Sequence, residues 1–159
     1  TFEVLRGNDT FTYDILKKEV NGYCAFGLYA KQYTEISDID INYEFVQTNT
    51  GGPSGGLLQT LYIYNELTTT DYTYGLKIAG TGTIDVLGNV GPIGGIEQKI
   101  ITSAMNQIDI FFVPHLSDSE NDNYIVAARI LETLNSDMIL VPVETFDDAL
   151  TYLQEMGGF

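Results

Sequence analysis

The chain has 159 residues, 44% of them hydrophobic, which is enough to bury the core of one domain with a small appendage. Its 22 acidic and 7 basic residues give a net charge of −15, which disfavours binding to nucleic acid and to anionic membrane surfaces. Neither a basic-then-apolar start nor an apolar run of about 18 residues occurs, so we expect no signal peptide and no membrane span in these residues.

Alternating apolar and polar residues predict β-strands in the first part of the chain. Residues 2–16 alternate on both sides of the turn sequence RGND, which predicts a β-hairpin. A strand-like segment, YCAFGLYA, follows at 23–30, and a second alternating run, DIDINYEFV, occupies 38–46. The chain is therefore expected to begin with a short β segment.

Helical periodicity appears after residue 56. The run at 57–67 is apolar nearly all round at helical length, which predicts a buried helix. Strands are expected at 76–80 and from residue 83, the second followed by turns. Apolar residues at helical spacing from Ile93 to Ile108 then predict an amphipathic helix.

The last third continues this alternation of strands and helices. The continuous apolar run at 108–114 is typical of a strand that is buried on both faces. SDSE at 117–120 has the spacing of a capping box and predicts a helix start. A strand at 138–143 and a final helix opened by Thr145 and Asp148 complete an α/β pattern with parallel strand pairing.

The glycine clusters do not fit a nucleotide site. GPIGGIEQK lacks the lysine and hydroxyl directly after the last glycine of a P-loop, and GTGTIDVLG lacks the third glycine of the dinucleotide fingerprint. With one cysteine (Cys24) and one histidine (His115), the sequence has no cluster of these metal ligands. We expect no nucleotide, no metal and no other cofactor.

His115 and the carboxylate pairs are weaker candidates. His115 follows a predicted strand and has Asp118 three residues on, which permits a base role, but an exposed loop histidine is the favoured interpretation. Carboxylate pairs such as Asp147 and Asp148 are interpreted as helix-start and solvated-surface residues. Such pairs are compatible with glycosidase chemistry, which uses two carboxylates, but no other feature of the sequence points to that activity.

Ser54 is the candidate nucleophile, because glycine pairs flank it in TNTGGPSGGLL. A serine hydroxyl needs an adjacent base, and a lysine acts as one only where apolar surroundings keep it neutral. Lys99 lies early in the predicted amphipathic helix, after GPIGG, where small residues permit close approach; Glu97 must then point elsewhere. We expect Ser54 and Lys99 to meet, and a flexible, inert loop is the alternative.

These two motifs resemble the proteolytic domain of Lon proteases. GGPSGGL, followed 45 residues after the serine by the lysine of GNVGPIGGIEQK, is similar to that family's Pro-Ser-x-Gly and Gly-Gly-x-x-x-Lys motifs. The resemblance covers roughly residues 38–156 and implies a Ser–Lys dyad, with Ser54 as nucleophile and Lys99 as general base. It also implies the α/β fold related to the second domain of ribosomal protein S5.

The resemblance implies supporting groups as well. Thr81, in GTGTI, matches a family threonine that orients the lysine. The backbone at Gly52 and Gly55 is expected to lie along the substrate, and amides at the helix start to bind an oxyanion. Two departures are visible: Gly55 replaces the family's usual alanine, and Gly51 stands where many members have an acidic residue.

The sequence is most similar to the PDZ-containing, membrane-anchored Lon-like proteases of bacteria. That resemblance implies that residues 1–34 end a PDZ-like domain, or else form an N-terminal β extension, and that residues 35–159 form the proteolytic domain. It further implies an extracytoplasmic, cell-surface location, with the membrane anchor outside this chain. A homo-oligomeric ring is an assembly that the family also implies.

We therefore expect an ATP-independent serine endopeptidase that cuts flexible or extended peptides or unfolded protein, such as surface or secreted peptides. Neither nucleic acid nor nucleotide is an expected partner. The alternative is a catalytically silent Lon-like/PDZ scaffold that binds peptides. Cleavage that disappears on Ser54→Ala would distinguish the enzyme from the scaffold.

Overall fold

The computed structural model describes residues 1–20, 23–25 and 52–158. The chain divides into two compact units, Thr1–Val46 and Gln47–Phe159. The predicted boundary between residues 34 and 35 and the predicted strand at 38–46 lie outside the described residues and stay predictions. In the described part of the chain, no helix combines the length and apolar character needed to cross a membrane.

The described residues of the first unit form two antiparallel strand pairs. Strands β1 (Phe2–Arg6) and β2 (Asp9–Tyr13) pair in register, which confirms the predicted hairpin. Strands β3 (Lys18–Val20) and β4 (Tyr23–Ala25) form the second pair. The first hairpin has little buried surface of its own, since Leu5 is 70% exposed.

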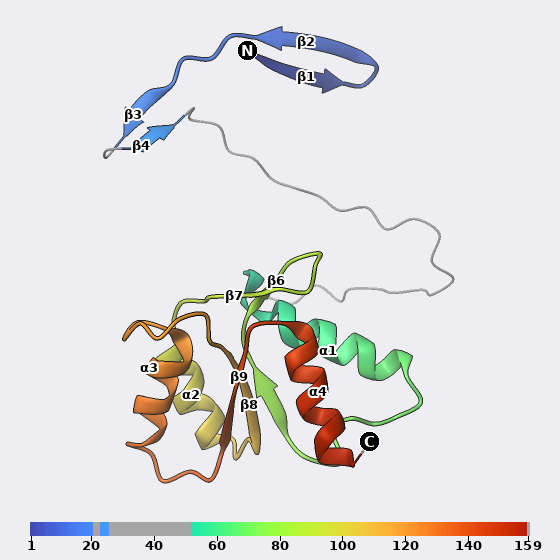
Figure 1. The fold of residues 1–159 in the computed structure, drawn as a ribbon, viewed down its shortest axis with the longest axis vertical. Coiled ribbons are helices and arrows are strands. Elements are labelled where there is room, and N and C mark those ends of the chain that lie inside the picture. Colours follow the sequence, from blue (N-terminus) through green and yellow to red (C-terminus); the bar gives the residue numbers. More distant parts are fainter. Residues whose placement is uncertain (21–22, 26–51, 159) are drawn as a thin grey trace. The chain divides into compact units, whose positions relative to one another are not determined.

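The second unit is a parallel sheet between two layers of helices (Figure 1). Its three parallel strands lie in the order β5 (Ile78–Gly80), β8 (Ile110–Pro114), β9 (Ile139–Val143). One face is covered by α1 (Gly56–Leu67) and α4 (Phe146–Gly157). The other face is covered by α2 (Ile96–Met105) and α3 (Asn123–Leu131). The predicted α/β architecture with parallel pairing is confirmed.

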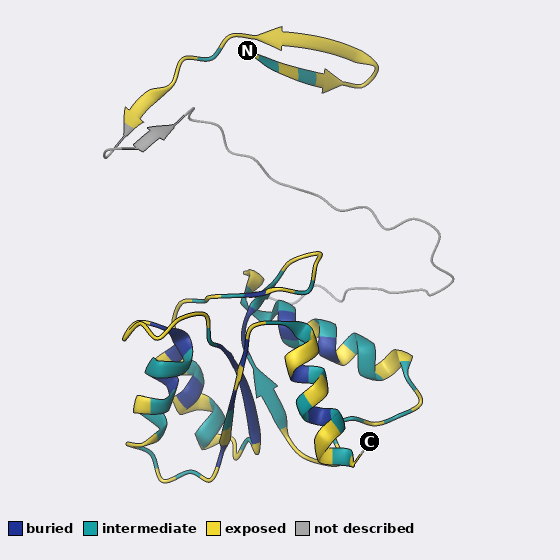
Figure 2. Ribbon diagram, viewed as in Figure 1, coloured by how far each residue is buried: buried dark blue, intermediate teal, exposed yellow. Residues whose placement is uncertain are grey.

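The central strand β8 explains how the two layers hold together. Ile110 and Phe112 pack in the cluster formed with α1 and α4, whereas Phe111 and Val113 pack in the cluster formed with α2 and α3. Every residue of β8 is buried, as the dark strand in Figure 2 shows. The prediction of a strand buried on both faces is confirmed.

Two helices differ from the prediction. Helix α1 is not buried all round: Leu57 and Leu61 face the core, but Tyr62 is 64% exposed, because only one side of the helix meets the sheet layer. Helix α2 begins at Ile96 rather than Ile93, because Gly95 adopts a left-handed conformation with φ of 70° that interrupts the helix. Ile93 still packs against the α2–α3 core from the preceding loop.

The predicted capping box at 117–120 is wrong. Helix α3 begins at Asn123, and its N-cap is Asp122, whose carboxylate accepts the Tyr124 amide at 2.9 Å. The capping box at Thr145 and Asp148, in contrast, opens α4 as predicted. The strand predicted from residue 83 is confirmed as β6 (Thr83–Ile84), but it pairs with a further strand, β7 (Val90–Gly91), where turns were expected.

Asp148 makes the start of α4 sensitive to acid. Desolvation acts to raise the pKa of Asp148, but the amides of Glu144 and Thr145, which donate to its carboxylate at 2.9 and 2.8 Å, and the Thr145 hydroxyl lower it below the usual value. A pKa lowered in the folded state stabilises the fold above the unfolded value of about 3.9, and this stabilisation is lost as pH falls through the folded pKa.

We expect Asp148→Asn to reduce the loss of thermal stability on acidification. Between about pH 5 and pH 3, its Tm should fall less than that of the wild type, because an amide does not titrate there. Thermal unfolding followed by circular dichroism measures this slope. Asp147→Asn, in the same turn of α4, is the matched control. Parallel Tm curves for wild type and Asp148→Asn contradict the prediction.

Candidate active site

Ser54 lies in a short turn that leads directly into α1. Residues Pro53–Gly55 form one turn of 3₁₀ helix, and α1 begins at the next residue. The turn begins at Pro53, whose ring restricts φ to helical values. The serine side chain is half-buried at this helix start, as the sequence predicts.

Hydrogen bonds fix the serine's main chain to the segment that follows β5. The carbonyl of Ser54 accepts the Gly82 amide and the Thr81 hydroxyl, both at 2.9 Å. Thr81 is fully buried, and its own amide donates to the Phe112 carbonyl at 2.9 Å. The serine turn is thereby tied to the central strand of the sheet.

Thr81 therefore contacts the nucleophile's backbone. The sequence resemblance implies that Thr81 orients the lysine, whereas its hydroxyl donates to Ser54 in the structure. A role toward Lys99 stays a prediction.

Two glycines permit the close approach of these segments. A Cβ atom at Gly82, whose φ is 154°, would lie 2.7 Å from Cγ1 of the buried Val90. A Cβ atom at Gly56 would lie 3.0 Å from Cγ2 of Ile84. The segment that approaches Gly56, just after the serine turn, is therefore the chain's own residues 82–90.

Gly52 and Gly55 have more open surroundings. Among the described residues, a Cβ atom at Gly52 would meet nothing within 4 Å, although its φ of 98° favours glycine, and one at Gly55 would meet only the Gln59 side chain at 3.6 Å. The amides of Gly56 and Leu57 donate to protein carbonyls, so they are not available to an oxyanion. The predicted substrate contacts of Gly52 and Gly55 stay predictions.

Helix α2 brings Lys99 to the serine. The Lys99 Nζ lies 3.4 Å from the Ser54 Oγ. The lysine is half-buried on α2 near Ile96 and Ile100, which are 6% and 0% exposed. Glu97 is exposed, and within the described residues no carboxylate lies at ion-pair distance from the amine.

This pair has the geometry of a nucleophile and its base. An amine beside a hydroxyl can take the hydroxyl proton as the oxygen attacks an electrophile. A separation of 3.4 Å is slightly beyond the range of about 2.6–3.2 Å for proton transfer, and such contacts tighten when substrate binds. Over residues 1–20, 23–25 and 52–158, no group of three His, Cys, Asp or Glu residues is arranged to hold a metal.

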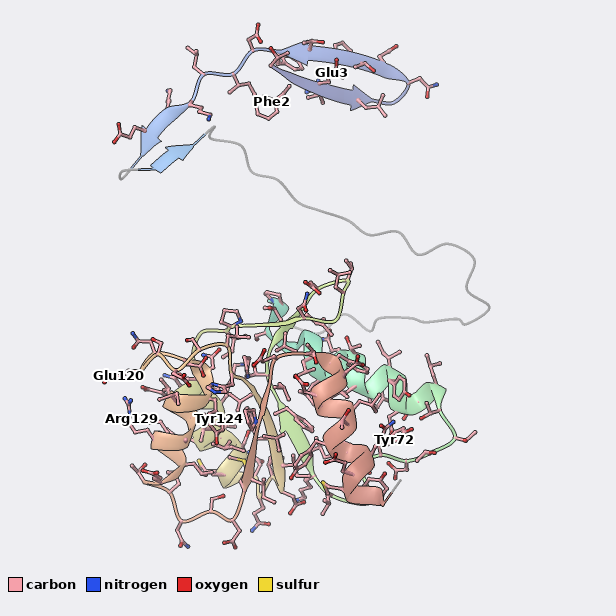
Figure 3. The ribbon with its side chains drawn as sticks, in the orientation of Figure 1. Phe2, Glu3, Tyr72, Glu120, Tyr124 and Arg129 are labelled. Carbon is pink, nitrogen blue, oxygen red and sulfur yellow. The ribbon has the colours of Figure 1, made fainter. Side chains whose placement is uncertain are left out.

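His115 is not the exposed loop histidine that we expected. Its Nδ1 lies 3.0 Å from the Oδ1 of Asp122, not Asp118, and its side chain is 29% exposed. The imidazole also packs beside the ring of Tyr124, which projects from the first turn of α3 (Figure 3), at 5.1 Å between centroids. A carboxylate seven residues away in sequence gave no periodic signal, so sequence reasoning missed this pair.

Asp122 connects the loop after β8 to α3. Burial acts to raise the pKa of Asp122, but hydrogen bonds from His115 and from the amides of Leu116, Tyr124 and Ser117 outweigh it and hold the pKa below its usual value. Within the described residues, no hydrogen bond joins His115 or Asp122 to Ser54 or Lys99. The pair is therefore a structural tie at this end of the sheet.

Known proteins similar to this chain share one family. Residues 6–155 match the Lon protease (S16) C-terminal proteolytic domain. The Lon protease of Azospirillum brasilense is 29% identical over 128 residues, which cover 80% of this chain and 15% of that relative. The Lon protease of Phenylobacterium zucineum is 28% identical over 148 residues, covering 93% and 17%. That of Campylobacter concisus is 32% identical over 99 residues, covering 62% and 11%. The chain thus spans 11 to 17% of the length of these relatives.

Proposed function

Because the chain belongs to the family of Lon protease (S16) C-terminal proteolytic domains, we propose that it is a serine peptidase whose nucleophile is Ser54 and whose general base is Lys99. The observation that carries this proposal is the 3.4 Å separation of Lys99 Nζ and Ser54 Oγ. Two motifs that lie 45 residues apart in sequence come together there, on a serine whose main chain is tied to the sheet.

In the proposed reaction the lysine acts as a base, then as an acid, and then as a base again. The neutral amine of Lys99 takes the proton of the Ser54 hydroxyl as the oxygen attacks the carbonyl carbon of a peptide bond. The resulting ammonium then gives that proton to the leaving amine, and an acyl-enzyme forms. Water, activated by the same amine, hydrolyses the ester and regenerates Ser54. Lys99 lies on α2 between the buried residues Ile96 and Ile100.

The proposed substrate is a flexible or extended peptide. The surroundings of Gly52 and Gly55 support this, because Gln59 is the one described side chain that a Cβ atom at either glycine would meet, which leaves room for a peptide main chain to approach. The Gly55 backbone is the proposed site of oxyanion contact, since it directly follows the nucleophile. We also propose that cleavage needs no ATP.

Three wider features rest on sequence resemblance. They are a PDZ domain preceding the proteolytic domain, a membrane anchor with an extracytoplasmic location, and a homo-oligomeric ring. They concern where the peptidase acts and how it assembles, so the chemistry proposed for Ser54 and Lys99 does not depend on them.

A cleavage assay tests the proposed function. The wild type, Ser54→Ala and the matched control Ser103→Ala, on α2, are incubated with a diverse mixture of unstructured peptides, with and without Mg-ATP, and products are identified by mass spectrometry. We expect the same products from the wild type and the control, none from Ser54→Ala, and no effect of ATP. A folded wild type that yields no Ser54-dependent product instead supports the peptide-binding scaffold.

A further inference from the structure

Asn123 is a buried polar residue whose side chain contacts another segment instead of its own helix. Its Oδ1 accepts the amide of Ile93 at 2.8 Å, and its Nδ2 donates to the carbonyl of the same residue at 3.0 Å. The residue is only 8% exposed. Capping of α3 does not require this side chain, because Asp122 already caps the helix.

The residue that Asn123 holds lies at the entrance to α2. Ile93 is followed by Gly94, where a Cβ atom would meet none of the described residues within 4 Å, and by Gly95 in the left-handed conformation. The Lys99 amide bonds the Gly95 carbonyl at 3.4 Å, so the lysine lies one helical turn beyond this loop. The loop therefore controls where the helix that carries Lys99 begins.

Two kinds of contact hold Ile93: packing of its side chain, and hydrogen bonds to its backbone. Its side chain packs against the α2–α3 core, which is a non-directional contact. The two hydrogen bonds from Asn123 are directional, and together they fix the orientation of the peptide groups on both sides of Ile93. Glycines after Ile93 cannot supply that restraint, because they have no side chain to limit the backbone.

We propose that Asn123 is a positioning residue for the peptidase: by holding both backbone polar groups of Ile93, it sets the start of α2 and so the approach of Lys99 to Ser54. This inference rests on the proposed function. The contact between Lys99 Nζ and Ser54 Oγ is already long at 3.4 Å, so it tolerates little displacement of the helix. A misplacement of about 1 Å at a reacting group costs roughly 100-fold in rate.

Kinetics of the full chain test the proposal. Asn123→Ala removes both hydrogen bonds, and Asn123→Asp keeps the volume and the acceptor for the Ile93 amide but cannot donate to its carbonyl. We expect kcat to fall by about 10- to 100-fold in Asn123→Ala, with KM changed less than about twofold, because the open backbone at Gly52 and Gly55 is untouched. Asn123→Asp should also lower kcat, and Asn121→Ala, an exposed neighbour, should match the wild type.

Two further measurements separate positioning from a purely structural role. In a Lys99→Met background, Asn123→Ala should lower the residual kcat no further, because its effect acts through the lysine. Amide hydrogen exchange at Ile93 should become about tenfold faster in Asn123→Ala, the factor expected on losing one hydrogen bond. The exchange measurement needs no activity.

The outcomes are distinguishable. A wild type with Ser54-dependent cleavage, together with folded Asn123 variants whose kcat stays within about twofold of it, overturns the inference and leaves the proposed function standing. The inference is also overturned if Asn123→Ala lowers kcat by the same factor in the Lys99→Met background as in the wild type. A wild type without Ser54-dependent products overturns both.

Discussion

Replacing Lys99 by methionine is expected to lower kcat by about 10²- to 10⁴-fold, the contribution of a positioned general base. Methionine is unbranched and apolar, so it can occupy this half-buried position on α2, but its thioether cannot take the Ser54 proton. Packing of α2 depends chiefly on Ile96 and Ile100, which the substitution leaves in place. The measurement is steady-state cleavage of a peptide product identified with the wild type.

The control and the double variant make this result specific. Lys77→Met alters an exposed lysine before β5 and should leave kcat unchanged. Ser54→Ala combined with Lys99→Met should be no less active than either single variant, because groups that act as one unit lose their effect together. Wild-type turnover in Lys99→Met, or additive losses in the double variant, would show that Ser54 has another base.

The sequence predicts the fold well where local pattern and tertiary contact agree. β8 reads as a continuous apolar run because helices cover both faces of the sheet, and the capping box of α4 uses residues within one turn. The prediction from sequence fails where several local conformations are compatible with the pattern and tertiary contacts select one of them. The apolar stripe from Ile93 continues across Gly95, although the left-handed glycine delays the start of α2.

The N-cap of α3 is a second feature that the local sequence pattern does not determine. Ser117, Ser119 and Asp122 all carry oxygens suited to capping, and their order along the chain does not say which one meets the helix amides. In the structure Asp122 prevails because its carboxylate also accepts the Leu116 amide and pairs with His115. That choice depends on where the loop after β8 passes, which local pattern does not encode.

In the candidate site, too, some residues are predictable from the sequence and others are not. Ser54 and Lys99 are predictable from residue type, glycine-rich surroundings and motif spacing, and the structure brings them to 3.4 Å, although their roles stay a proposal. The contact of Asn123 with Ile93 joins segments 30 residues apart and leaves no periodic trace. One signal was available: Asp122 and Asn123 place two polar residues at a helix start where one is enough for the cap.

The largest effect on stability is expected from Phe112→Ala, at about 3–5 kcal/mol of unfolding free energy. Phe112 is fully buried in the middle of β8, and its ring meets that of Tyr152 on α4 edge-on, with centroids 5.9 Å apart. Removing the ring leaves a cavity between the sheet and the α1–α4 layer. A typical domain is stable by about 5–15 kcal/mol, so the loss is a large share of the total.

The same position connects stability to the site, since the Phe112 carbonyl accepts the amide of Thr81 and thereby anchors the serine turn. Denaturant unfolding monitored by circular dichroism measures the effect. Phe112→Leu, which keeps most of the volume, should cost less than about 1.5 kcal/mol. Phe11→Ala, in the exposed hairpin where the ring is 41% exposed, should cost much less than Phe112→Ala. If Phe112→Ala unfolds at the wild-type midpoint, then β8 is not the strand that holds the two helical layers together.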